Sequence, residues 1–120
     1  MNGTVDENLR ALIDISISAN SGSNKRPVKV WIDTAFNGGL VIPHTEIESL
    51  GLKEASSTPA ILADGQMVNL TTFTCYQEWF GNEYRTQVVA NDGEFPLLGT
   101  MLMAERSLAI DYKLKTVTLD

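Results

Sequence analysis

The sequence predicts an all-β fold, either a sandwich or a barrel, on the basis of two observations. Short segments alternate apolar and polar residues as half-buried strands do, for example residues 12–17 and 108–112. Clusters of turn-forming residues separate these segments at close spacing, as in residues 20–24. Many short strands divided by turns are typical of sandwiches and barrels. A length of 120 residues suits a single core, so we expect one domain.

In the first half of the domain, the sequence predicts a hairpin, a loop and a short helix. Residues 12–17 and 28–32 predict the hairpin, and the second of these strands runs directly into a loop of small residues, 33–39. Residues 40–42 predict a short strand that ends at Pro43. Thr45 and Glu48 have the spacing of a capping box and predict a short helix, which ends at Gly51 in a left-handed cap.

The second half predicts three more hairpins. Residues 60–63 and 66–74 flank Asp64-Gly65, which predicts a tight turn, and residues 76–80 and 84–90 flank Gly81-Asn82. Residues 100–105 predict one or two helical turns, and 108–112 with 116–119 form the last hairpin. We expect residues 1–9 to be a flexible N-terminal segment, or an edge strand in a dimer, ahead of a domain spanning 10–120.

Charge and composition exclude several classes of function. The net charge of -6 disfavours binding to nucleic acid and to anionic membranes. A single cysteine, Cys75, and a single histidine, His44, exclude an internal disulfide and a Cys/His zinc site, and we expect neither a metal nor a cofactor. The polar N-terminus has no apolar leader, which predicts a cytoplasmic location.

Asp33 is the carboxylate whose sequence context points to chemistry. It ends an apolar strand, and the hydroxyl of Thr34, the small Ala35 and two glycines follow it. Small residues let backbone N–H groups approach a carboxylate or a substrate closely. Asp14 and Asp111 lie in alternating strands, where a carboxylate is expected to point to solvent. The competing interpretation of Asp33 is a turn aspartate that merely enters a loop.

The segment Val30 to Pro43 resembles the active-site segment of retropepsin-like (clan AA) aspartic peptidases, in which an apolar strand ends in Asp-Thr/Ser-Gly. Three further motifs follow in the order of that family. The stretch from Glu46 to Leu52, which ends in Leu50-Gly51-Leu52, is similar to its helical turn, and Ala63-Asp64-Gly65 to the tip of its flap hairpin. The stretch from Pro96 to Leu102, followed by residues 108–111, is similar to its second signature. The resemblance covers about residues 10–119, and the ordered set of motifs is more specific than any one of them.

The resemblance implies a small closed barrel of the retropepsin (acid protease) type, with one or two short helices, assembled as a two-fold dimer. It implies an endopeptidase in which Asp33 is catalytic, Thr34, Ala35 and Gly99 support the active-site loop, and Asp64 and Gly65 form the flap tip. Two carboxylates must share a proton in this chemistry. Because the chain has one such loop, the second carboxylate is expected from the other subunit of a homodimer, acting on a peptide or protein substrate.

Ala35 is the departure from the family pattern, which usually has glycine there. An alternative is therefore a catalytically impaired dimeric or peptide-binding module with the same fold. A third interpretation is an unrelated small β-barrel interaction domain in which Asp33 is incidental. Cys75 and His44 are a further candidate pair of nucleophile and base, although no third group or motif supports that pair.

Overall fold

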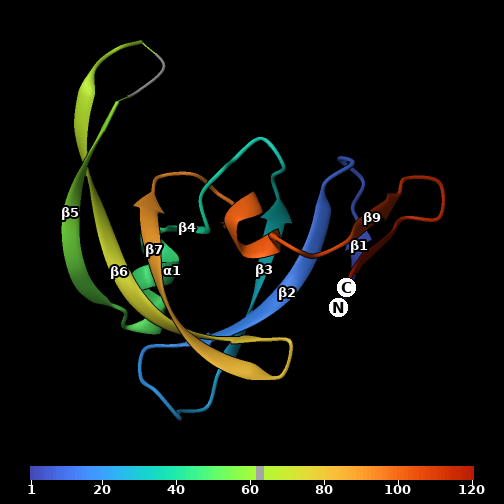
Figure 1. The fold of residues 1–120 in the computed structure, drawn as a ribbon, viewed down its shortest axis with the longest axis horizontal. Helices are drawn as coiled ribbons and strands as arrows, with labels where there is room; N and C mark the ends of the chain where they lie inside the picture. Colours follow the sequence, from blue (N-terminus) through green and yellow to red (C-terminus); the bar gives the residue numbers. More distant parts are fainter. Residues whose placement is uncertain (62–63) are drawn as a thin grey trace.

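The structure is a computed structural model that describes residues 1–61 and 64–120, and it confirms the all-β prediction (Figure 1). One α-helix and one short 3₁₀-helix, η1, interrupt the strands. The elements are β1 (Asn2–Val5), β2 (Ala11–Ser18), β3 (Arg26–Ile32), β4 (Leu40–Pro43), α1 (His44–Leu50), β5 (Lys53–Ile61), β6 (Met67–Trp79), β7 (Asn82–Asn91), β8 (Leu97–Leu98), η1 (Thr100–Met103), β9 (Leu108–Asp111) and β10 (Thr116–Leu119).

Six of the strands close into a barrel. They follow one another in the order β6, β7, β4, β8, β3 and β2, and a pairing between β2 and β6 completes the ring. That last pairing is antiparallel and joins Ser16 to Glu78, Ile17 to Gln77 and Ser18 to Tyr76. Closure removes the free edges that an open sheet of this size would leave.

Alternation along the strands fills the barrel with apolar side chains. In β3, Val28, Val30 and Ile32 are 5%, 0% and 6% exposed, whereas Lys29 and Trp31 between them point outward. The same core takes Ile13, Ile15 and Ile17 from β2. This packing supplies most of the favourable free energy of folding, because it removes large aliphatic side chains from water.

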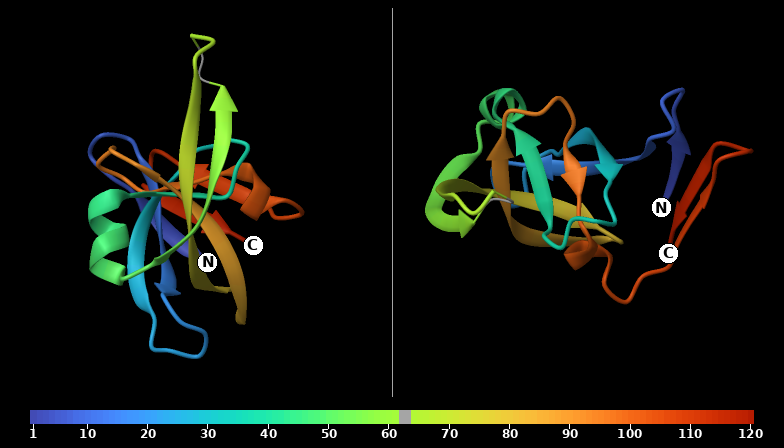
Figure 2. Two further views of the ribbon diagram at one scale, coloured as in Figure 1. Left: turned by 90° about the vertical axis from the view of Figure 1, so that its left-hand side faces the viewer. Right: turned by 90° about the horizontal axis from the view of Figure 1, so that it is seen from above.

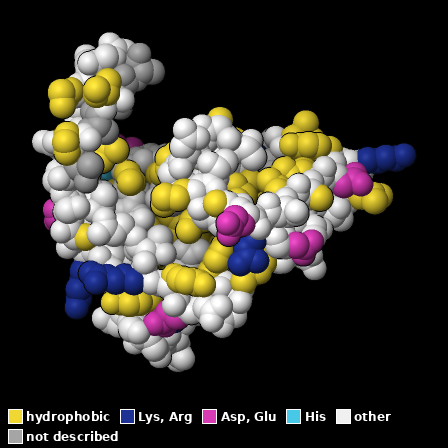
Figure 3. All heavy atoms as spheres, viewed as in Figure 1, with side chains coloured by type: hydrophobic (Ala, Val, Ile, Leu, Met, Phe, Trp, Pro, Cys, Tyr) yellow, Lys and Arg dark blue, Asp and Glu magenta, His cyan; other side chains and the backbone are white. Residues whose placement is uncertain are grey.

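The β5–β6 hairpin projects beyond the barrel as an arm, most clearly in the left view of Figure 2. Its strands pair as far as Ile61 and Met67, which are 73% and 70% exposed, and Figure 3 shows apolar side chains near the end of this arm. Two predicted strands, 66–74 and 76–80, form the single strand β6, since β6 pairs with β7 without a break from Thr72 to Trp79. Residues 62–63 of the expected turn lie outside the described residues.

The first nine residues differ from the expected flexible segment, because Asn2–Val5 forms β1 between β2 and β10. The Met1 ammonium donates a hydrogen bond to the carbonyl of Leu119 at 2.6 Å. Val5 is 4% exposed and packs in the core. The sequence signal was weak because Val5 is the sole large apolar residue of the strand, which is held by backbone pairing on both sides.

The prediction of a capping box at the start of α1 is wrong. The helix begins directly after Pro43, and no side chain caps its N-terminus. The predicted C-terminus is confirmed, since Gly51 has φ +69°, its N–H donates to the carbonyl of Glu48, and the Leu52 N–H donates to that of Ile47. In the described part of the chain, no helix is both long and apolar enough to cross a membrane.

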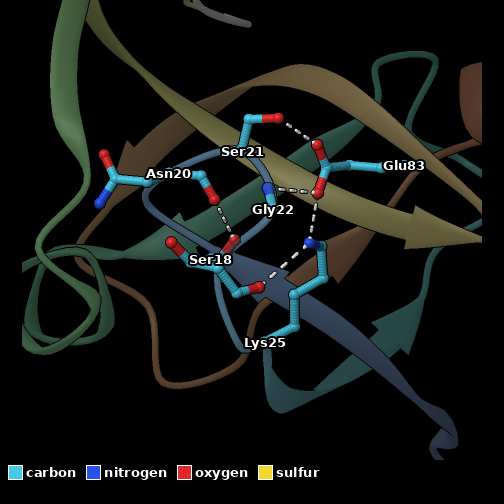
Figure 4. A network of polar contacts seen from close by, with 7 residues as sticks. Ser18, Asn20, Ser21, Gly22, Lys25 and Glu83 are labelled. Atoms are coloured by element: carbon cyan, nitrogen blue, oxygen red, sulfur yellow. Dashed lines mark hydrogen bonds and ion pairs between the residues drawn. The ribbon is translucent and has the colours of Figure 1, made fainter.

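A carboxylate clamp joins the β2–β3 loop to the start of β7 (Figure 4). Glu83 accepts hydrogen bonds from the Lys25 ammonium at 2.5 Å, the Ser21 hydroxyl at 2.6 Å and the Gly22 backbone N–H at 3.0 Å. These donors, with Lys25 the largest contributor, lower the pKa of Glu83 from 4.5 to about 2. The depressed pKa means that the folded state holds this carboxylate ionised in acid that would protonate it in the unfolded chain.

Glu83 should make the stability of the protein depend on pH in acid. Its contribution is fully present above pH 4.5 and is lost as the pH falls toward about 2, because the unfolded state binds the proton first. We expect Glu83→Gln to show a smaller loss of melting temperature across this window than the parent, as measured by circular dichroism. Glu48→Gln on α1 is the control and should behave as the parent does. Equal losses of melting temperature in the parent and in Glu83→Gln would show that Glu83 is not the source of this pH dependence.

Gln77 should be replaceable by leucine with a gain in stability. The residue is 1% exposed, and neither atom of its amide has a hydrogen-bond partner among the residues that the structure describes. A buried unpaired polar group costs about 1–3 kcal/mol, so Gln77→Leu should raise the free energy of unfolding by about that amount in urea denaturation. Gln66→Leu, at an exposed site, should change it little. Destabilisation by Gln77→Leu would show that the amide is satisfied in solution.

Candidate active site

The loop that carries Asp33 is shaped by the strand β8, which lies between β3 and β4. β8 pairs parallel to β3 and antiparallel to β4, so the chain leaving β3 must pass around the end of β8 before it enters β4. At the start of this loop, the Asp33 N–H donates to the carbonyl of Leu98 at 2.9 Å. At its end, the Gly99 N–H donates to the carbonyl of Gly39 at 2.7 Å. The two ends of the loop are thus bonded to two consecutive residues, Leu98 and Gly99.

The middle of the loop is held by η1. The carbonyl of Phe36 accepts hydrogen bonds from the backbone N–H of Thr100 at 2.8 Å and from its hydroxyl at 3.2 Å. The N–H of Met101 donates to the carbonyl of Gly38 at 3.2 Å. Residues 98–101 therefore hold the loop at Asp33, Phe36, Gly38 and Gly39, and they satisfy the backbone groups of the loop at these four positions.

The Asp33 side chain is half-buried and faces an open groove. One carboxylate oxygen, Oδ1, accepts the N–H of Ala35 at 3.0 Å, which fixes the orientation of the carboxylate within its own turn. The alternation of β3 places Asp33 on the outward face that it shares with Trp31, which is 39% exposed. The groove has a volume of about 470 Å³ and is lined by Trp31, Ile32, Asp33, Thr34, Ala35 and Leu97.

A cluster of aromatic rings and one guanidinium group adjoins this groove. The rings of Trp31 and Phe95 meet edge to face with centroids 6.3 Å apart. The Arg10 guanidinium lies 4.1 Å from the Phe95 centroid and 5.7 Å from that of Trp31, and it is ion-paired with Asp6 at 2.7 Å. Hydrogen bonds from Arg10 lower the pKa of Asp6. The cluster fixes the Trp31 ring beside Asp33 by cation–π and edge-to-face contacts.

The structure brings Asp33, Thr34, Ala35 and Gly99 together and leaves the expected flap tip apart from them. Asp64 and Gly65 lie at the end of the β5–β6 arm, where Gly65 has φ +86° and Asp64 accepts the Gln66 N–H at 3.0 Å. Within the described ranges, no hydrogen bond joins this turn to the Asp33 loop.

Ala35 has an ordinary backbone conformation. Among the described residues, the non-glycine residues with positive φ are Leu9, Phe80, Glu105 and Lys115. The loop therefore does not require glycine at position 35 for conformational reasons, and the methyl group of Ala35 lies exposed at the groove.

Three contributors to this site were not predicted from the sequence. Leu97 and Trp31 both line the groove with Asp33. The alternation in β3 carried the signal for Trp31, since Ile32 faces inward and its neighbours must face outward. Phe36, whose carbonyl accepts two hydrogen bonds from Thr100, had no signal in the sequence because the contact is made by the backbone.

The other candidate chemistry is excluded by geometry. Cys75 is fully buried, and burial raises the pKa of its thiol to about 12, so it remains a protonated thiol. The side chain of His44 is 52% exposed and its nearest charged partner is Asp92, at 3.9 Å. Across residues 1–61 and 64–120, no three His, Cys, Asp or Glu side chains are grouped so as to hold a metal ion.

Gly99 should tolerate no side chain. A Cβ atom at this position would lie 2.1 Å from the Gly38 carbonyl oxygen and 2.6 Å from the Phe36 ring, so the Asp33 loop would have to move. We expect Gly99→Ala to lower the free energy of unfolding by about 1–3 kcal/mol in urea denaturation. Gly93→Ala is the matched control, since its Cβ would meet the end of the Asn91 side chain at 3.2 Å, and it should cost much less. Equal costs would show that the loop can move freely.

Comparison with known proteins identifies the fold. No protein-family model and no curated protein matches the sequence. The structure is similar to a retropepsin-like aspartic protease from Rickettsia conorii, with a TM-score of 0.64 and 16% identity over 99% of this chain and 88% of the other. It is also similar to the protease of EIAV in complex with the inhibitor HBY-793, with a TM-score of 0.57 and 16% identity over 85% of this chain and 92% of the other.

A third similar structure is the retroviral protease-like domain of Ddi1 from Leishmania major. Its TM-score is 0.52, with 13% identity over 91% of this chain and 88% of that domain. At such identities the likeness is one of fold, and it extends over nearly the whole chain. The chain therefore has the fold of the retropepsin-like aspartic proteases, and its barrel is not of a different type.

Proposed function

We propose that this protein is an aspartic endopeptidase that hydrolyses peptide bonds with a dyad of Asp33 carboxylates from two subunits. The observation that supports this most is the placement of Asp33. It is a half-buried carboxylate at an open groove, on a loop held from end to end by residues 98–101. The shared fold with aspartic proteases makes that chemistry plausible for this chain.

The second carboxylate must come from another copy, because the other aspartates of interest are engaged elsewhere. Asp14 is exposed on β2 and pairs with the Lys29 ammonium at 3.2 Å. Asp111 accepts the N–H groups of Lys113 and Leu114, each at 2.9 Å, in the turn between β9 and β10. A two-fold axis beside the Asp33 groove would bring two identical carboxylates together.

In such a dyad the two carboxyl groups share one proton, since like charges so close cannot both be ionised. The ionised member takes a proton from a bound water, and that water attacks the carbonyl carbon of the scissile peptide bond. The protonated member donates a hydrogen bond to the carbonyl oxygen, where negative charge develops. The two Asp33 groups titrate as a pair in this scheme.

The remaining site residues support this chemistry. Thr34 would brace the loop against its partner at the axis, and Ala35 and Gly99 would keep the loop close to the substrate. The Asp64–Gly65 turn of the long arm would close over an extended peptide, bound mainly through backbone hydrogen bonds. The exposed Ile61 and Met67 would give this flap an apolar surface against the substrate.

The exposed methyl group of Ala35 favours one alternative. It lines the same groove as Asp33 and takes up space that a glycine would leave open to a peptide backbone. The alternative function is a dimeric or peptide-binding module of the same fold with impaired catalysis.

Cleavage of a diverse peptide mixture, read by mass spectrometry from mildly acidic to neutral pH, tests the proposal. We expect the parent to cleave and Asp33→Asn to lose at least 10³-fold in rate, on the order of the effect of removing an essential catalytic group. Asp14→Asn is the matched control, since it changes an exposed aspartate outside the groove, and it should cleave as the parent does. Cleavage by Asp33→Asn at the parent rate would contradict the assignment of Asp33 as the catalytic carboxylate.

Light scattering of the same samples separates the two functions. A dimer that cleaves supports the endopeptidase. A folded dimer that does not cleave supports the impaired module, and Ala35→Gly should then restore cleavage if the methyl group is the obstacle. A strict monomer at the assay concentration contradicts both.

A further inference from the structure

The loop that carries Asp33 contains an asparagine followed directly by glycine, Asn37-Gly38. In such a pair the backbone nitrogen of the glycine can attack the side-chain amide carbon of the asparagine, because glycine has no side chain to shield that nitrogen or to restrict the backbone. The attack closes a succinimide ring. It requires that neither group is held by another hydrogen bond and that the chain at the asparagine can turn.

Both reacting groups of this pair are free in the folded protein. Asn37 is exposed and lies outside the helices and strands, in the turn between β3 and β4 (Figure 1). Within residues 1–61 and 64–120, the Asn37 side-chain amide makes no hydrogen bond and the Gly38 N–H donates none. The attack of the Gly38 nitrogen on Asn37 therefore requires no unfolding of the barrel.

The packing of the loop requires glycine at position 38. A Cβ atom there would lie 2.4 Å from the Phe36 ring. The same ring would lie 2.6 Å from a Cβ atom at position 99, so it is held between Gly38 and Gly99 and cannot easily give way. The loop thus keeps, directly after Asn37, the residue that makes an asparagine most reactive.

Hydrogen bonds hold the chain on both sides of Asn37. The Phe36 carbonyl accepts the Thr100 N–H at 2.8 Å, and the Gly38 carbonyl accepts the Met101 N–H at 3.2 Å. The two donors are consecutive residues of η1, so their spacing fixes the spacing of the two carbonyls. A main chain that became longer between Phe36 and Gly38 could not keep both bonds without moving the loop.

We propose that Asn37 is a site of spontaneous deamidation, and that its isoaspartate product releases the Asp33 loop from η1. The Gly38 nitrogen bonds to Cγ of Asn37, and ammonia leaves with the proton of that nitrogen. Water then adds to a carbonyl of the succinimide, and the bond from that carbonyl to the ring nitrogen breaks. Opening at the side-chain carbonyl gives aspartate. Opening at the backbone carbonyl gives isoaspartate, whose main chain runs through Cβ and contains an additional methylene group.

A second Asn-Gly pair, Asn2-Gly3, provides a control within the same chain. Both residues lie in β1 and are paired with Thr118 and Val117 of β10. The extended strand keeps the glycine nitrogen away from the asparagine side chain until the strand opens locally. We therefore expect Asn2 to deamidate at least about tenfold more slowly than Asn37 in the folded protein.

Mass spectrometry of protein kept for days at neutral pH measures both rates. Trypsin cleaves after Arg10, Lys29 and Lys53, so peptides 1–10 and 30–53 report the two pairs separately. We expect peptide 30–53 to gain the mass of deamidation steadily and to separate by chromatography into aspartate and isoaspartate forms. In urea, where β1 is unfolded, the two peptides should deamidate at similar rates.

The effect on the loop is measured on the same aged samples. The melting temperature of the parent should fall by about 3 °C or more as isoaspartate accumulates, because the bonds at Phe36 and Gly38 are lost. Asn37→Gln is the matched variant, since its longer side chain keeps the amide but closes a ring much more slowly, and ageing should leave its melting temperature unchanged. A parallel loss of peptide cleavage in the parent rests on the proposed function, whereas the mass and melting measurements do not.

Two results would overturn the proposal. The first is deamidation of Asn37 in the folded protein at or below the rate of Asn2. The second is a parent sample rich in isoaspartate at position 37 that melts at the temperature of the fresh protein. A parent that cleaves no peptide at any age, yet deamidates and loses melting temperature as described, would contradict the proposed function and support the modification site.

Discussion

The position of Asp33 depends on one set of hydrogen bonds, those between residues 98–101 and the loop from Asp33 to Gly39. The loop contains seven residues and no regular secondary structure, so it satisfies only part of its own backbone groups, such as the N–H groups of Ala35 and Phe36, which donate to Asp33. Further partners come from four consecutive residues, since Leu98 to Met101 bond Asp33, Phe36, Gly38 and Gly39. Because these residues form β8, η1 and the link between them, the geometry of the loop is set largely by the barrel and by η1.

This arrangement requires close packing of backbone on backbone. Gly99 is the point of closest approach, where the Gly38 carbonyl and the Phe36 ring occupy the space that a side chain would need. β8 is only two residues long, yet Leu98 is fully buried and pairs with strands on both sides. A short strand in this position is stable because its neighbours β3 and β4 hold it, and its own backbone contributes little.

Most of the fold could be predicted from the sequence, since alternation in β2 and β3 and the turn residues between strands report local structure directly. Asp33, Thr34, Ala35 and Gly99 were also predicted to act together, and the structure places them in one loop and its support. The features that the sequence could not predict depend on backbone pairing between strands that are far apart in the sequence. β1 and the continuous strand β6 are recognised only through their partners, which no local pattern specifies.

The burial of Cys75 has a practical consequence for attaching a label to this molecule. It is the single cysteine of the chain, and its sulfur lies inside the barrel with a pKa near 12, so alkylating reagents will find almost no thiolate there. A cysteine introduced at an exposed position of the β5–β6 arm, such as Met67, would then be the one reactive thiol. A spin label or fluorophore can therefore be attached to the arm of the natural protein, without first removing Cys75 and leaving a cavity in the core.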